Sequence, residues 1–128
     1  MIFFILGSHP DISIAEIKQV IKDQNQIYNE LHRSDSVLVI DQIDVNLGQL
    51  QETLAGTIKV GRIIGEMNVF DLTGTTDLIG SYASGAMGKN KISFGLSVYD
   101  LGGKHKTRDI VDEIDDIGSS VKKYLKET

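Results

Sequence analysis

The opening of the chain, MIFFILGSHPDISIAEIKQVI, most constrains the fold, because an apolar run is followed at once by a helical pattern. Five apolar residues occupy Ile2–Leu6, and no basic residue precedes Lys18. An export signal needs a basic segment before a longer apolar core, and a membrane-spanning helix needs about 20 apolar residues. We therefore expect a buried strand at residues 2–6.

A helix is predicted near residues 14–24. Ser13 and Glu16 have the spacing of a capping box, and Ile12 and Ile17 have the spacing of a hydrophobic staple. The apolar residues that follow recur every three or four positions, as on one face of a helix. They are Ile14, Ile17, Val20 and Ile21.

Four further elements are predicted before residue 69. They are strands at 27–33 and 37–40 joined by a turn at Ser34–Ser36, a helix at 47–55 with Asn46 as N-cap and Gly56 at C′, and a strand at 58–64. The order β-α-β-β-α-β is that of a ferredoxin-like domain, in which both helices cover one face of an antiparallel sheet. We assign this α+β domain to residues 1–68.

Residues 69–128 read as an α-β-α segment. A junction at 72–76 precedes a helix at 76–87, and the strict alternation of KISFGLSVY predicts a half-buried strand at 91–99. A last helix has a buried stripe of Ile110, Ile114, Ile117, Val121 and Leu125, and Gly118 is expected to break it in two. Sixty residues are few for an independent domain, so this segment either packs on the first domain or belongs to something longer.

Charge and composition restrict the class of protein. The chain has no cysteine, which excludes disulfides and thiolate metal sites and favours a cytoplasmic location. The net charge of -5 argues against uniform attraction to nucleic acid. Between residues 89 and 108, however, five basic residues face only Asp100, so this segment carries +4. Such a patch either binds phosphates or is an ordinary solvated surface.

No complete catalytic, cofactor or metal motif occurs in the sequence. The pairs Gly88-Lys89 and Gly103-Lys104 both fail the Walker A pattern at two positions. The histidines, His9, His32 and His105, lie in three separate elements without metal-ligand spacing. His9 is expected in a turn and His32 on a strand facing water. The acids of residues 112–116 are expected to form a solvated helix face, and no G-x-S-x-G motif is present.

Three stretches resemble the N-terminal region of tRNA guanine-N2-methyltransferases and related RNA methylases of archaea and bacteria. They are FFILGSHPDISIAEI, LAGTIKVGRIIGE and KISFGLSVYDLGGKHK, with SSVKKYLKET at the end. In that family an ILG-x-x-P-x-x-S-x-A-E motif opens a ferredoxin-like domain and a G-T-x-K-x-G strand closes it. An F-G-x-S-x-Y strand there belongs to a THUMP-type RNA-binding domain. The matching residues are Ile5, Leu6, Gly7, Pro10, Ser13, Ala15, Glu16, Gly56, Thr57, Lys59, Gly61, Phe94, Gly95, Ser97 and Tyr99.

The resemblance implies a non-catalytic tRNA-recognition region. The family's catalytic domain binds S-adenosylmethionine and carries a [DN]-P-P-[FYW] motif, whereas Pro10 is the only proline here and no G-x-G-x-G loop is present. A methylase domain is therefore expected elsewhere, in cis or in trans, and no cofactor is expected on this chain. The expected partner is tRNA or another structured RNA, no membrane is expected, and a homodimer is left open. The proposed phosphate contacts are Lys89, Lys91, Lys104, Lys106, Arg108, Lys122, Lys123 and Lys126. The alternative is a protein-interaction or dimerisation scaffold without an RNA role.

Overall fold

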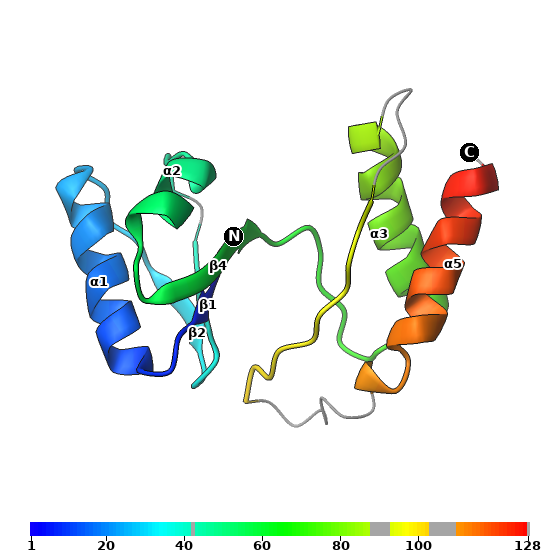
Figure 1. Cartoon of the computed structure of the whole chain (residues 1–128), viewed down its shortest axis with the longest axis horizontal. Coiled ribbons are helices and arrows are strands. Elements are labelled where there is room, and N and C mark those ends of the chain that lie inside the picture. The colour runs from blue at the N-terminus through cyan, green and yellow to red at the C-terminus, as the bar shows by residue number, and fades with distance from the viewer. Residues whose placement is uncertain (42, 88–92, 103–109, 128) are drawn as a thin grey trace. The chain divides into compact units, whose positions relative to one another are not determined.

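The computed structural model describes residues 1–41, 43–87, 93–102 and 110–127, and it divides them into two compact units. The first unit holds Met1–Ile63 together with Tyr99–Gly102, and the second holds the remaining described residues from Ile64 onwards. The elements of the first are β1 (Ile2–Leu6), α1 (Pro10–Asp23), β2 (Glu30–Arg33), β3 (Val37–Ile40), α2 (Leu47–Thr53) and β4 (Thr57–Arg62). Those of the second are α3 (Leu72–Met87) and α5 (Ile114–Glu127) (Figure 1).

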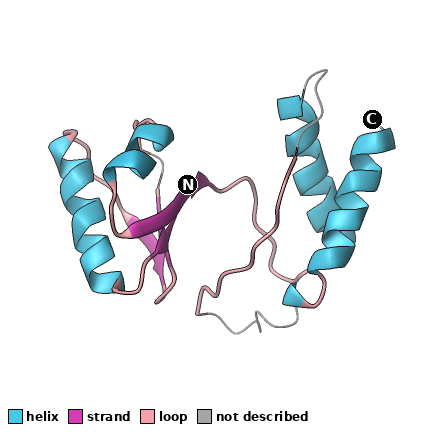
Figure 2. Ribbon diagram, viewed as in Figure 1, coloured by secondary structure: helices cyan, strands magenta, loops and turns pink. Residues whose placement is uncertain are grey.

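The first unit is a four-stranded sheet with the strand order β2-β3-β1-β4. Every neighbouring pair is antiparallel, and β1 lies between β3 and β4 with Phe4 opposite Leu38 on one side and Val60 on the other. Helices α1 and α2 lie on the same face of this sheet (Figures 1 and 2). The expected α+β class, the antiparallel sheet and the element order of residues 1–63 are confirmed.

Alternation along β1 builds an apolar layer on each face of the sheet. Ile2, Phe4 and Leu6 pack beneath the helices in one cluster. The helices contribute Ile14, Ile17, Ile21, Leu50 and Leu54 to it. Ile5 lies in a smaller cluster with Val37 and Val39. A strand buried on both faces reads as a continuous apolar run, which is why Ile2–Leu6 lacks polar interruptions.

Helix α1 begins four residues before the predicted start. Pro10 occupies the first helical turn after His9, and its fixed φ suits this position because its missing N–H would have no helical partner there. The predicted capping box is wrong, since His9 is the N-cap and makes no side-chain capping bond. The hydrophobic staple is also wrong, because Ile12 is 68% exposed.

Ser13 and Glu16 instead connect α1 to the loop before β4. The buried Ser13 hydroxyl donates to the carbonyl of Gly56 at 2.8 Å, and the Glu16 carboxylate accepts from the N–H of Gly56 at 2.9 Å. The Gly7 N–H also donates to the Gly56 carbonyl at 3.0 Å. Gly56 thereby joins the loop that follows β1 to the loop that precedes β4.

Short-range signals at two other turns behave as expected, but the predicted end of the helix at 47–55 is wrong, because α2 ends at Thr53 with Leu54 as its C-cap and Gly56 is not at C′. Asn46 is the N-cap of α2, and its side chain accepts from the N–H of Gln49 at 3.0 Å. The predicted turn between β2 and β3 is confirmed, because Ser34 donates its N–H to the Val37 carbonyl at 2.8 Å. The predicted strand at 27–33 is shorter, since β2 begins only at Glu30.

The second unit corrects three predictions. Residues 72–76 are the first turn of α3 rather than a junction, and the carboxylate of Asp71 accepts from the N–H of Gly74 at 2.9 Å to cap it. Helix α5 continues through Gly118 because burial of Ile117 and Val121 outweighs a glycine cost of about 1 kcal/mol. The described residues 93–99 of the predicted strand at 91–99 form no ladder, and 91–92 lie outside the described residues.

Asp41 joins the segment before β2 to the end of β3. The pKa of Asp41 lies below its ordinary value, first because the backbone N–H of Asn29 donates to the carboxylate and also because the Asn29 amide does so. This contribution to folding is complete above the unfolded pKa of about 4 and is lost as pH falls through the lower folded pKa. We expect Asp41→Asn to have a lower melting temperature than the wild-type chain at pH 7, and this difference should shrink in thermal unfolding as pH falls through the folded pKa of Asp41. A difference that does not change with pH would contradict this assignment.

Candidate nucleic-acid interface

Three of the predicted RNA-binding residues gather on one exposed surface of α5, which we call the lysine face. Lys122, Lys123 and Lys126 are all exposed, and they fall within about 100° of arc on the helix. This arc lies opposite the buried stripe of Ile117 and Val121. The amphipathic spacing of the helix therefore places these ammonium groups in solvent.

No member of the lysine face forms an ion pair with another described residue. The acids of the first turn, Asp115 and Asp116, lie near the opposite end of α5. Cations in the last turns and acids in the first both interact favourably with the helix dipole. The basic residues of α5 thus lie in its C-terminal half, where Glu127 is the one acid among the described residues.

A polar cavity of about 300 Å³ lies beside the lysine face, between α3 and α5. Lys123 lines it together with the hydroxyl-bearing residues Thr73, Thr76, Ser120 and Tyr124. The Thr76 hydroxyl is buried and has no hydrogen-bond partner in the described part of the chain. Asp77 and Glu127 also line the cavity, so its charge is mixed. Ammonium and hydroxyl groups are the side chains that contact phosphate and sugar oxygens in nucleic-acid complexes.

Close packing of α3 against α5 shapes this cavity. A Cβ atom at Gly80 would lie 2.4 Å from the Tyr124 ring, so only glycine allows this approach. The Ser81 and Tyr124 hydroxyls are 3.2 Å apart and share a hydrogen bond. Sequence reasoning missed the cavity because its lining depends on which faces of the two helices meet. The small residue at position 80 was the only available signal.

The other five predicted RNA contacts lie outside the described residues. They are Lys89, Lys91, Lys104, Lys106 and Arg108. His105 also lies outside them. The structure therefore brings together only the three C-terminal lysines of the predicted set.

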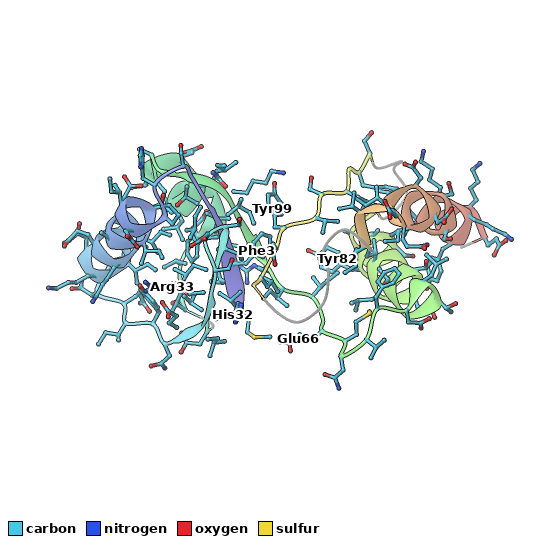
Figure 3. All side chains as sticks on the ribbon, turned by 90° about the horizontal axis from the view of Figure 1, so that it is seen from below. Phe3, His32, Arg33, Glu66, Tyr82 and Tyr99 are labelled. Carbon is cyan, nitrogen blue, oxygen red and sulfur yellow. The ribbon has the colours of Figure 1, made fainter. Side chains whose placement is uncertain are left out.

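The chain returns to the first unit at Tyr99–Gly102, which the sequence did not indicate. Ser34 donates its hydroxyl to the Asp100 carbonyl at 2.8 Å, and a ring nitrogen of His32 bonds the Leu101 carbonyl. The Lys59 ammonium lies 5.6 Å from the centroid of the Tyr99 ring, in the range of a cation–π contact. Tyr99 and His32 are labelled in Figure 3. His32 is exposed as predicted, but it also anchors this segment.

A second cavity of about 390 Å³ lies in the first unit at the start of α1. Its lining includes Ser8, His9 and Thr57. His9 precedes the helix in the turn where the sequence placed it. No lysine or arginine lines this cavity, so it offers less to a phosphate than the cavity beside the lysine face.

Two further kinds of feature, metal-binding clusters and membrane-spanning helices, are absent from the described residues. No three His, Asp or Glu side chains among the described residues are grouped so that they could hold a metal ion. None of the described helices is long and apolar enough to cross a membrane. No protein-family model, curated protein or solved structure matches the chain.

Proposed function

We propose that this chain is an RNA-recognition module that contacts the phosphate backbone of tRNA through the lysine face. It would serve a methylase domain of the tRNA guanine-N2-methyltransferase type, supplied in cis or in trans. That domain, and not this chain, would bind S-adenosylmethionine. The exposed and unpaired state of Lys122, Lys123 and Lys126 carries the proposal.

The chemistry of the surface supports contacts that read no sequence. Lysine ammonium groups bind phosphate oxygens as point charges, and hydroxyls such as those of Thr73 and Ser120 bind phosphate or the 2′-OH. Because the whole chain is acidic, long-range attraction is weak and binding must depend on this local surface. The ferredoxin-like and THUMP-like assignments belong to the same proposal, and the strand order β2-β3-β1-β4 supports the first of them.

A salt series tests the proposal directly. In fluorescence anisotropy with labelled tRNA, the logarithm of the association constant should fall linearly with the logarithm of salt concentration. Three phosphate contacts give a slope of about -2 to -3, and the basic residues of 89–108 would steepen it if they take part. A DNA duplex of the same length serves as the control polyanion. Absence of binding at 50 mM salt, or equal affinity for the DNA duplex, would refute RNA recognition.

A protein-interaction role is the second candidate function. It is favoured by the backbone of residues 93–98, which makes no hydrogen bond within the described part of the chain. The two roles are compatible, because they use different residues of the second unit.

A further inference from the structure

The cavity at the start of α1 holds a buried hydroxyl without a partner. Thr57 lines this cavity and is only 5% exposed, and its hydroxyl bonds no other group in the described part of the chain. Thr57 lies opposite Leu6 in the sheet, so its side chain projects from the face that carries α1. A buried hydroxyl that makes no hydrogen bond costs folding free energy. A ligand oxygen in the cavity would supply the missing bond.

The first turn of α1 carries N–H groups that also lack an acceptor. Pro10 has no N–H, and the Ser13 N–H donates to the His9 carbonyl at 3.0 Å. Between them, the N–H groups of Asp11 and Ile12 have no helical acceptor, and the His9 side chain does not cap them. His9 and Ile12 both line the cavity. Free N–H groups and the positive end of the helix dipole attract an anion to this end of the helix.

The charges around the cavity favour a singly charged anion. No carboxylate, lysine or arginine is among the described residues that line it, and His9 is the single titratable side chain among them. On α1, Asp11 is exposed and outside the lining, and the Glu16 carboxylate already accepts from the N–H of Gly56. Phosphate is usually held with the help of arginine or lysine, which this cavity lacks. A carboxylate needs only N–H and hydroxyl donors.

Two exposed isoleucines give the cavity an apolar wall. Ile12 and Ile58 line it, and they are 68% and 58% exposed. Ligand sites typically combine apolar walls with a few polar groups that fix the ligand's orientation. The cavity volume of about 390 Å³ lies near the lower end of the range of about 300–1,000 Å³ for such sites. A small ligand with an apolar part and one anionic group therefore fits best.

We propose that this cavity binds a small aliphatic carboxylate. The carboxylate oxygens accept from the Thr57 hydroxyl and from the N–H groups of Asp11 and Ile12, and the aliphatic chain lies against Ile12 and Ile58. The site uses the first unit alone and does not depend on RNA binding.

Titration of the full chain with 4-methylpentanoate at pH 7 tests this site. We expect saturable changes in the amide NMR signals of Asp11, Ile12 and Thr57 at millimolar ligand, and a melting temperature that rises with ligand concentration. The neutral 4-methylpentanamide has nearly the same shape and should give no saturable change. Acetate lacks the aliphatic chain and should bind about tenfold more weakly. The proposal is overturned if the acid does not bind saturably, or if the amide or acetate binds as tightly as the acid.

Thr57→Val separates a ligand site from a purely structural role. Valine has a similar shape and removes a hydroxyl that has no partner, so the melting temperature of the empty chain should be equal to or above that of wild type. Affinity for 4-methylpentanoate should nevertheless fall about tenfold, because a hydrogen bond to the carboxylate is lost. Thr53→Val makes the same chemical change at an exposed residue outside the cavity and should bind like wild type. Equal affinities in the two variants would remove Thr57 from the site and overturn the assignment.

Discussion

Replacing Gly7 with alanine is expected to lower the free energy of unfolding by about 2–4 kcal/mol. The added Cβ atom would lie 2.5 Å from the carbonyl oxygen of Gly56, which is backbone and has no rotamer with which to move away. The loops must separate, and the 3.0 Å bond between the Gly7 N–H and that carbonyl would be lost with the contact. Urea denaturation followed by circular dichroism measures the change as a shift in midpoint at constant slope.

The matched control is Gly85→Ala in α3. A Cβ atom there meets nothing within 4 Å, and alanine is favoured over glycine inside a helix by about 0.5–1 kcal/mol. The same chemical change should therefore leave the chain equally stable or stabilise it. If Gly7→Ala is no more harmful than Gly85→Ala, the close approach of the two loops does not describe the molecule in solution.

Predictions that depended on neighbouring residues were accurate at some positions and wrong at others. Asn46 was identified as an N-cap because a capping bond joins residues three apart. The alternation of residues 93–99 predicted which side chains would be sheltered, but a ladder requires a partner strand that the pattern cannot supply. The Gly and Thr residues of 73–76 favoured a turn, and the cap from Asp71 makes them a helical turn instead.

Ser13 and Glu16 show why the remaining features could not be predicted. Their spacing is that of a local capping box, yet both side chains bind Gly56, about 40 residues away. Pro10 begins the helix without their help, which releases them for this tertiary role. The contact of His32 with Leu101 likewise joins residues 69 apart, and no periodicity carries such information.

In the candidate site, too, one feature could be predicted from the sequence and another could not. Exposure of the lysine face followed from amphipathic spacing alone, since the buried stripe of α5 fixes the opposite side. The cavity next to it depends on Gly80 meeting the ring of Tyr124, which is a property of the packed pair of helices. Sequence therefore predicted the charged surface but not the hydroxyl groups beside it.

Reversing two charges of the lysine face should have the largest effect on function. For Lys122→Glu combined with Lys126→Glu, we expect tRNA affinity at 50 mM salt to fall on the order of a hundredfold. The slope of log affinity against log salt should become shallower by about 2, because two phosphate contacts are lost. The difference from wild type should narrow as salt rises, since screening weakens both the lost attraction and the new repulsion.

Lys18→Glu combined with Lys22→Glu is a closely matched control on α1. These lysines are also exposed and four residues apart, and Lys22 lies in the last turn of its helix as Lys126 does. Both double variants therefore change the net charge equally and oppose a helix dipole to the same extent. The control should weaken tRNA binding several-fold at most, through the overall field of the molecule. Equal losses in the two variants would assign binding to net charge and would remove the lysine face as a recognition surface.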